Sequence, residues 1–314
     1  MDQHEFTNWL LNAGTPTIRF QTMTDLLGYP ADEPRLVQAR QEIMSSGAVP
    51  AILSHQSKTG SWQGERSYYT PKYTSTHWSM LLLVEYSVDG RDARFHEGAR
   101  HMLEVTAGDL SGRVETNTPG WDCFWGNLLR YALHAGLAAD ARVENVIHYT
   151  AINLQDGPCR CEHNRGPCAW GAVRALWGLA AIPKARRTPE LEGAIAQAVA
   201  FLLDSFRLIE ANYPTWENKA PNPLWFKLNF PLFYQADILF TLRVLDELNL
   251  LDHPGAQAAL DWLEQRRLRN GRWPGVSPYR PRTWRELGDR EETARWVSLQ
   301  ASRILLHAGR LSFS

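Results

Sequence analysis

Apolar and polar positions along the chain follow helical spacing in two alternating textures. In one set of segments a single face is apolar, and each segment begins with an N-cap residue or with proline at the first helical position. These segments span residues 92–105, 140–154, 188–206 and 252–267, with a shorter one at 33–45. In the other set apolar residues lie on more than one face, which is typical of a helix buried on nearly all sides. Those segments span residues 74–88, 121–136, 168–182, 230–248 and 292–307.

This alternation predicts an all-α fold built from helix hairpins. The amphipathic segments are expected to form an outer layer and the apolar segments an inner layer. With a further short pair at 15–27 and 33–45, the pattern indicates about six hairpins in one domain spanning residues 1–314. Both chain ends, 6–11 and 303–311, are apolar and helical in character and lack polar capping repeats. We therefore expect the hairpins to close into an α/α toroid with two concentric helix layers instead of an open solenoid.

Three loops repeat a common arrangement between hairpins. The first reads Gln56-x₃-Gly60-x-Trp62 and the third Arg267-x₃-Gly271-x-Trp273. In the middle copy, which begins at Asn153, a cysteine (Cys159) replaces the aromatic residue. Each loop is expected to end an outer helix with a polar residue, turn at glycine, and pack the last residue back onto the helices.

The first of these loops resembles the QW motif of the terpenoid cyclase and protein prenyltransferase superfamily. More specifically, the chain is similar to a bacterial group of single-domain proteins with prenyltransferase and squalene-oxidase repeats. The matching stretches are Gly14-Thr-Pro16, Gly126-Asn127-Leu-Leu, Phe230-Pro-x-x-Tyr-Gln-Ala-Asp237 and Trp296-Val-Ser-Leu299. The resemblance implies an α/α toroid and an isoprenoid ligand. The Asp-x-Asp-Asp motif with which squalene-type cyclases protonate their substrate does not occur in the sequence.

Composition narrows the classes of partner. The chain has 314 residues, 44% of them hydrophobic, and a formal net charge of −1 from 33 basic and 34 acidic residues. This balance gives no long-range attraction to nucleic acid or anionic lipid. The sequence also lacks a signal-peptide pattern and any apolar run of the ~18–20 residues that a membrane span needs. We expect a cytoplasmic protein without a transmembrane segment.

The four cysteines suggest a metal site. Three of them lie in the run Cys159-x-Cys161-x-His163-x₄-Cys168, and Cys123 stands at the matching start of the preceding inner helix. Zinc favours such a Cys/His tetrahedron, and a toroid would bring the two helix starts together. The expected ligands are Cys123, Cys161, His163 and Cys168, with Cys159 as a substitute. The alternative is that these cysteines act as small buried hydrophobic residues.

Two residues are candidates for acid–base chemistry. Asp237 is expected in the middle of an apolar helix, where burial would raise its pKa and suit it to act as a general acid. A structural pairing with an arginine or with a helix N-terminus is the alternative. His77, near the start of an inner helix, is either an acid–base or ligand-binding group or a satisfied core histidine.

Aromatic residues are dense on the predicted inner helices. They are expected to line a central cavity for a hydrophobic small molecule, or else to fill the ring as core. The candidates are Trp78, Trp121, Phe124, Trp125, Trp170, Phe233, Tyr234 and Trp296.

Three functions remain open, and the sequence does not decide whether the chain is an enzyme. The first is a prenyltransferase- or cyclase-like protein that handles an isoprenoid, with a zinc ion near the cavity. The second is a carbohydrate-active enzyme on an (α/α)₆ ring, which requires two carboxylates ~5–10 Å apart. The third is a non-catalytic, zinc-stabilised scaffold. A deep apolar tunnel would favour the first, a wide polar cleft the second, and a filled centre the third.

Overall fold

The structure is a computed structural model that describes residues 3–63, 67–155, 160–161, 166–212 and 221–313. These residues are helical apart from turns, loops, one isolated bridge and a two-residue antiparallel pair, β1 (Arg160–Cys161) with β2 (Gly166–Pro167). This confirms the prediction of an all-α protein. The α-helices are α1 (Gln3–Leu11), α2 (Pro16–Gln21), α3 (Pro34–Ser45), α4 (Ala48–Ser54), α5 (Thr76–Glu85), α6 (Ala93–Glu115), α7 (Asp122–His134), α8 (Ala141–Gln155), α9 (Ala169–Ala180), α10 (Pro189–Ala200), α11 (Ile238–Glu247), α12 (Pro254–Gln265) and α13 (Arg290–His307). Two π-helical turns, η1 (Thr22–Leu26) and η3 (Phe201–Phe206), and four 3₁₀ turns, η2 (Lys184–Arg186), η4 (Pro223–Phe226), η5 (Arg280–Arg282) and η6 (Arg285–Leu287), complete the set.

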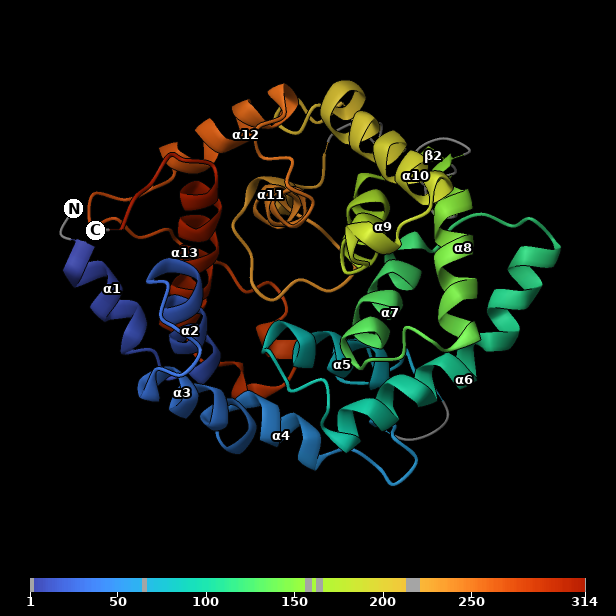
Figure 1. The fold of residues 1–314 in the computed structure, drawn as a ribbon, viewed down its shortest axis with the longest axis horizontal. Helices are drawn as coiled ribbons and strands as arrows, with labels where there is room; N and C mark the ends of the chain where they lie inside the picture. The colour runs from blue at the N-terminus through green and yellow to red at the C-terminus, as the bar shows by residue number, and fades with distance from the viewer. Residues whose placement is uncertain (1–2, 64–66, 156–159, 162–165, 213–220, 314) are drawn as a thin grey trace.

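The helices lie in two layers around a common centre. Figure 1 shows α3, α4, α6, α8, α10 and α12 on the outside, with α5, α7, α9, α11 and α13 nearer the middle. Burial follows the same division: every residue of α5 except Val84 is buried, whereas α12 buries only one face. The apolar and amphipathic segments of the sequence thus correspond to inner and outer helices.

Several outer helices begin at the cap residues that the sequence indicates. The Asp92 carboxylate accepts hydrogen bonds from the backbone N–H groups of Arg94 and Phe95 at the start of α6. The Thr188 hydroxyl accepts one from Leu191 at the start of α10. Such caps satisfy backbone donors that a helix start leaves without partners, and they fix where each outer helix begins.

The two chain ends lie against each other (Figure 1), and α13 contacts both α1 and α2. The Glu292 carboxylate, at the start of α13, accepts hydrogen bonds from the backbone N–H groups of Gly14 and Thr15 at 3.1 and 2.9 Å. The indole of Trp9 donates to Glu291 at 3.0 Å. The first and last helices are therefore joined by specific polar contacts as well as by apolar packing.

The first repeated loop has the arrangement predicted for it. The Gln56 side-chain amide donates to the Gly60 carbonyl at 3.1 Å, and Gly60 takes a left-handed φ of 81°. Trp62 is fully buried, and its indole N–H donates to the carbonyl of Ile52 in α4 at 2.7 Å. Its backbone N–H donates to the hydroxyl of Thr76, the first residue of α5. One aromatic residue thus ties an outer helix to the next inner helix.

The third loop repeats these contacts. The Arg267 guanidinium donates to the Gly271 carbonyl at 3.3 Å, and Gly271 has a φ of 79°. Trp273 is fully buried; its indole donates to the Leu263 carbonyl at 2.8 Å and its backbone N–H to the Ser298 hydroxyl at 2.9 Å. The middle loop runs into residues 156–159, which lie outside the described residues together with Cys159.

Inner helices α7 and α9 pack backbone to backbone. A Cβ on Gly126 would stand 2.3 Å from the carbonyl oxygen of Arg174, and one on Gly178 would stand 2.4 Å from the Gly126 oxygen. Only glycine permits this approach. It brings the starts of the two helices together, with Cys123 on one and Cys168 on the other.

Two predicted helix starts are wrong in detail. Helix α11 begins at Ile238, so residues 230–237 are not helical, and Asp237 is the N-cap and not a mid-helix residue. The peptide bond between Phe230 and Pro231 is cis. Cys168 likewise caps α9 and does not lie in its first turn.

No helix among the described residues is both long and apolar enough to cross a membrane.

Candidate functional site

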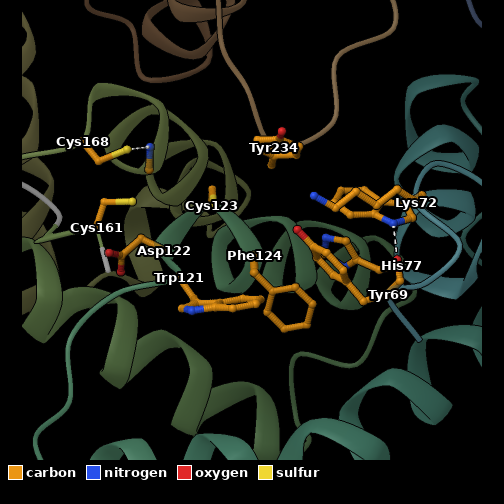
Figure 2. A pocket seen from close by; sticks show the side chains of 12 residues that line it. Tyr69, Lys72, His77, Trp121, Asp122, Cys123, Phe124, Cys161, Cys168 and Tyr234 are labelled. Atoms are coloured by element: carbon orange, nitrogen blue, oxygen red, sulfur yellow. Dashed lines mark hydrogen bonds between the residues drawn. The ribbon is translucent and has the colours of Figure 1, made fainter. Parts of the chain in front are cut away.

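A pocket opens where the inner helices begin, and we name it the aromatic–thiol pocket. The starts of α5, α7 and α9, strand β1 and the loops before α5 and α11 form it, and its cavity volume is about 120 Å³. Its lining residues are Tyr69, Lys72, His77, Trp78, Trp121, Asp122, Cys123, Phe124, Cys161, Cys168, Gly171 and Tyr234. Figure 2 shows Cys161 and Cys168 on one side of the pocket, Tyr69 and His77 on the other, and Cys123 between them.

The aromatic side is a connected set of rings. The centroid of Tyr69 lies 4.7 Å from that of Trp78 and 5.8 Å from that of Trp121, and Phe124 follows at 6.1 Å from Trp121. Trp121 precedes α7 with a left-handed φ of 63°. Edge and tilted contacts of this kind hold each ring in a defined orientation.

The predicted cavity aromatics do not all meet at this pocket. Trp78, Trp121, Phe124 and Tyr234 line it. Trp170 and Phe233 pack behind these rings, and Trp125 lines a neighbouring groove on the α6 side. Trp296 lies at a separate recess, stacked on Phe230 with centroids 4.4 Å apart.

Lys72 stands at the exposed side of the pocket. Its ammonium nitrogen lies 5.5 Å from the ring centroid of Tyr69 and 5.4 Å from that of Tyr234, within cation–π range of both. Sequence reasoning missed Tyr69 and Lys72 because both belong to a loop without periodic pattern. The available signal was the aromatic pair Tyr68-Tyr69 just before an inner helix.

His77 is fully buried at the back of the pocket. Its ring stacks on Phe124 at 4.4 Å and meets Trp78 edge-on at 4.7 Å. Nδ1 lies 3.3 Å from the Tyr131 hydroxyl, whereas Nε2 has no hydrogen-bond partner among the described residues. Burial, with a smaller contribution from the charge of Arg174, lowers the pKa of His77 to about 3. The imidazole is therefore neutral at physiological pH.

Three of the four predicted metal ligands line the same pocket. Cys123 comes from the first turn of α7, Cys161 from β1, and Cys168 from the N-cap of α9, where its sulfur accepts from the Gly171 N–H at 3.4 Å. The fourth predicted ligand, His163, lies outside the described residues. Burial raises the pKa of Cys123 to about 12, so a nearby cation would be needed to hold its thiolate.

The described residues contain no grouping of three or more His, Cys, Asp or Glu side chains with the geometry of a metal site. The three sulfurs share a pocket without forming a ligand set on their own. Both His163 and its possible substitute Cys159 lie outside the described residues.

Asp122 is the single carboxylate among the described residues of the pocket wall. It is buried, and one oxygen accepts from the Asn153 side-chain amide at 2.9 Å. This contact connects α7 to α8 at the level of the thiols.

Asp237 does not line the pocket. One carboxylate oxygen accepts from the Phe240 N–H at 2.7 Å, and the other accepts from the backbone and side-chain N–H groups of Asn229 at 2.9 and 2.8 Å. Burial raises the pKa of Asp237 to about 6, although these three donors oppose the shift. The contacts give Asp237 a capping role that joins α11 to the loop before it.

Large side chains pack between the inner helices. Arg174, on α9, is fully buried and donates two hydrogen bonds to the Gln235 carbonyl, at 2.9 and 2.6 Å. Its guanidinium carbon lies 3.9 Å from the ring centroid of Phe240 and 5.3 Å from that of Trp177. Burial lowers the pKa of Arg174 to about 9. Arg174, Trp177 and Phe240 thus pack together between α9 and α11.

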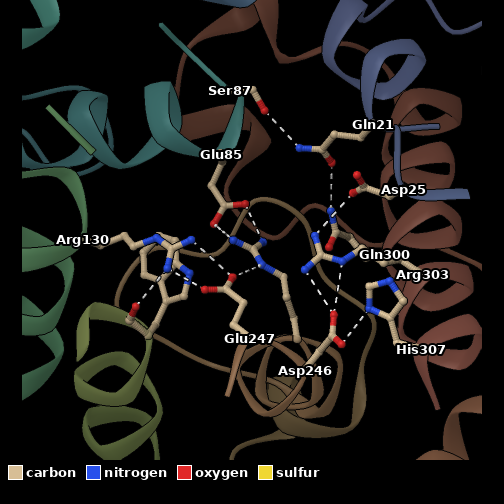
Figure 3. Close-up of polar contacts among 12 residues, drawn as sticks. Gln21, Asp25, Glu85, Ser87, Arg130, Asp246, Glu247, Gln300, Arg303 and His307 are labelled. Carbon is tan, nitrogen blue, oxygen red and sulfur yellow. Dashed lines mark hydrogen bonds and ion pairs between the residues drawn. The ribbon is translucent and has the colours of Figure 1, made fainter. Parts of the chain in front are cut away.

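The opposite ends of the inner helices carry a network of charged side chains, which we name the ion-pair layer (Figure 3). Its members lie at the far ends of the inner helices, beside a polar recess of about 460 Å³. They are Glu85, Arg130, Arg243, Asp246, Glu247 and Arg303.

Each arginine of the layer joins two helices. Arg243 on α11 binds Glu85 on α5 through two contacts of 2.7 and 2.9 Å. Arg130 on α7 binds Glu247 on α11 at 2.5 Å. Burial alone would raise the pKa of Glu247, but the charges of Arg130 and Arg243 outweigh it and hold the pKa below its usual value. Because its carboxylates are engaged with arginines, we assign the layer a structural role.

Comparisons with known proteins give no relative. No family model matches the chain, and neither a curated protein nor a solved structure matches it.

Proposed function

We propose that this chain is an α/α toroid of the terpenoid cyclase and prenyltransferase type that binds an isoprenoid-class small molecule in the aromatic–thiol pocket. The two-layer arrangement, the contact between first and last helices and the repeated Trp62 and Trp273 anchors support the toroid. The substrate class rests on the family resemblance of the sequence together with the character of the pocket.

The observation that carries the proposal is the pocket's size and lining. A cavity of about 120 Å³ is close to the ~150 Å³ apolar cavity that accommodates benzene. That space suits a short isoprenoid or the terminal isoprene unit of a longer one, and it does not suit a folded triterpene precursor. Flat rings such as Trp121 and Phe124 offer the π-faces that a branched, unsaturated carbon chain packs against.

We further propose that a zinc ion binds beside this pocket, held by Cys123, Cys161, Cys168 and His163. Three thiols from three separate elements line one wall, and soft sulfur donors together with an imidazole suit zinc. When bound, zinc would keep the thiols deprotonated and fix the segment that carries β1 and β2 to α7 and α9.

Ligand binding is tested by titrating purified protein with geraniol while following tryptophan fluorescence, since Trp78 and Trp121 line the pocket. We expect saturable quenching that is lost in Cys123→Leu, whose larger side chain occupies the cavity. Val37→Leu, an equivalent enlargement at an exposed position on α3, should bind as the wild type does. Quenching that does not saturate in the wild type contradicts the proposal, and so does quenching of equal strength in Cys123→Leu and Val37→Leu.

Zinc is tested by elemental analysis of protein purified without added metal. We expect about one zinc per chain in the wild type and a large loss in the double variant Cys161→Ala, Cys168→Ala. A wild-type protein without zinc that also fails to take up added zinc contradicts this part of the proposal.

The filled centre supports a second candidate, a non-catalytic scaffold. Arg174, Trp177 and Phe240 occupy the position where a deep substrate tunnel would run. A scaffold would bind zinc and remain folded without binding any isoprenoid, so the two titrations above separate it from the first candidate.

The carbohydrate hypothesis gains no such support. Among the described residues the pocket has one carboxylate, Asp122, and at the opposite end Glu85 and Glu247 are engaged by arginines. A glycosidase needs two available carboxylates across its substrate.

A further inference from the structure

One buried polar atom of a residue that lines the aromatic–thiol pocket has no hydrogen-bond partner among the described residues. His77 is fully buried and lines the pocket, yet its Nε2 has no hydrogen-bond partner among the described residues. A buried donor or acceptor left unsatisfied costs ~1–3 kcal/mol, so most such groups in native proteins find a partner. The orphaned nitrogen indicates that a bound molecule supplies the missing one.

The Tyr131 hydroxyl determines what kind of partner is missing. The nearest described partner of that buried hydroxyl is Nδ1 of His77, at 3.3 Å. A tyrosine hydroxyl needs an acceptor for its proton, and Nδ1 is the one in reach. If Tyr131 donates to Nδ1, then the imidazole proton resides on Nε2. The missing partner is therefore an acceptor, such as the oxygen of an alcohol, ether or carbonyl.

The imidazole is also held in place before any ligand arrives. Its ring is stacked against Phe124 at 4.4 Å and lies edge-on to Trp78 at 4.7 Å. A donor fixed by aromatic packing loses little conformational freedom on binding, which favours a specific hydrogen bond over a general polar attraction.

The charges around the pocket exclude a strongly anionic partner. Lys72 is the one cationic side chain among the described lining residues, and Asp122 is the one carboxylate. Diphosphates are held by several cationic donors or a metal cluster, and one exposed lysine does not supply that. An apolar wall with a single neutral donor suits a ligand with one uncharged oxygen.

We propose that the aromatic–thiol pocket recognises an isoprenoid that carries a neutral oxygen, and that His77 is the residue that selects for this oxygen by donating a hydrogen bond from Nε2. The inference rests on the proposed function and adds the polar group of the ligand to it. Hydrocarbon and diphosphate forms of the same carbon skeleton are expected to bind less well.

The test uses three probes with one five-carbon skeleton: 3-methylbut-2-en-1-ol, 2-methylbut-2-ene and dimethylallyl diphosphate. Dissociation constants for the full-length protein are measured by ligand-observed NMR, which tolerates weak binding. We expect the alcohol to bind about tenfold more tightly than the hydrocarbon, as one buried hydrogen bond implies, and more tightly than the diphosphate.

Variants assign the preference to His77. His77→Phe keeps a flat ring but removes the donor, so the alcohol-over-hydrocarbon preference should fall to about one. His77→Gln retains a side-chain N–H and should keep part of the preference for the alcohol. His134→Phe is the matched control, because His134 is hydrogen-bonded to the Val88 carbonyl at 2.8 Å and lies away from the pocket. That variant should leave the preference unchanged.

The outcomes separate this inference from the proposed function. Equal binding of alcohol and hydrocarbon by the wild type, tighter binding of the diphosphate, or a preference that survives in His77→Phe overturns the inference while isoprenoid binding stands. Failure of all three probes, and of geraniol, overturns the proposed function and the inference with it. The wild-type comparison needs no variant, so misfolding of His77→Phe does not block the test.

Discussion

The two ends of helix α11 place a buried carboxylate in opposite surroundings. At the start of the helix Asp237 is held by backbone and amide N–H donors, and burial raises its pKa to about 6. At the end of the helix Glu247 faces Arg130 and Arg243, which outweigh burial and keep its pKa below its usual value. The carboxylate at one end of α11 is thus held by uncharged N–H donors, and the one at the other end is paired with cationic side chains.

The same division distinguishes the two ends as functional regions. At the pocket end the residues include a neutral imidazole, thiols and aromatic rings, and Nε2 of His77 has no partner among the described residues. At the other end the ion-pair layer connects α5, α7, α11 and α13. Unmet hydrogen-bonding capacity is where a ligand gains free energy, whereas paired charges hold the helices in place. We therefore assign binding to the first end and the joining of the inner helices to the second.

The largest expected effect comes from breaking the ion-pair layer. Arg243→Met leaves Glu85 buried without its partner, and we expect a loss of about 3–5 kcal/mol in the free energy of unfolding. Urea denaturation measures it. The double variant Glu85→Leu, Arg243→Met should recover most of the loss because no unpaired charge remains. A single variant as stable as the wild type would remove the distinction between the two ends.

A smaller loss of stability is expected from a substitution at the contact between α7 and α9. Gly126→Ala places a Cβ 2.3 Å from the Arg174 carbonyl oxygen, so the helices must separate, at a cost of about 1–3 kcal/mol. Gly112→Ala on α6 is the control, since its Cβ meets nothing within 4 Å and the change should stabilise the protein by up to ~1 kcal/mol. Thermal unfolding of both variants compares them. Equal effects would show that close packing does not position Cys123 beside Cys168.

The contrast between Asp237 and Glu247 can be tested by pH. Asp237→Asn sets an amide N–H against the Asn229 donors and should lower the free energy of unfolding by about 1–2 kcal/mol near pH 4.5. Folding raises the pKa of Asp237 to about 6. The contribution of Asp237 to the free energy of unfolding is therefore fully present below the pKa that this group has in the unfolded chain, and it is lost as pH rises through 6. The difference between variant and wild type should therefore shrink from pH 4.5 to 7.5 in urea denaturation. A difference that grows with pH would show that the three donors dominate over burial.

The smallest effect is expected at the mouth of the pocket. Lys72→Met removes an exposed ammonium whose contacts with Tyr69 and Tyr234, among the described residues, are cation–π interactions, so stability should change by less than ~1 kcal/mol. Like Arg243→Met, this substitution replaces a cationic side chain with methionine. Thermal unfolding of the two variants therefore compares the stability that a cation of the pocket contributes with the stability that a cation of the ion-pair layer contributes. A loss at Lys72 as large as that at Arg243 would contradict the proposed division of roles.

Much of the fold could be predicted because burial leaves a strong signature in sequence. Helix α9, with the sequence AWGAVRALWGLA, is apolar on nearly all sides, and its position in the inner layer follows directly. The turn-and-tryptophan loops at Gly60 and Gly271 were predictable for a similar reason, since glycine and a buried aromatic residue mark the turn and its anchor.

The site was harder to predict because it depends on contacts between distant segments. The apolar run from Phe230 to Phe240 has the composition of a helix, yet the helix begins at Ile238, where Asp237 caps it and also binds Asn229. Arg174 is one polar residue in an apolar helix, yet its side chain is fully buried against the ring of Phe240. Pairing of this kind is set by tertiary packing, which local pattern does not encode.

A crystal structure of the protein soaked with 3-methylbut-2-en-1-ol tests directly whether the aromatic–thiol pocket is the ligand site. We expect electron density for the alcohol among Tyr69, Trp121 and Phe124, with its oxygen within hydrogen-bond distance of Nε2 of His77. Density at the recess beside the ion-pair layer instead, or a pocket that stays empty when the alcohol is shown to bind in solution, would contradict it.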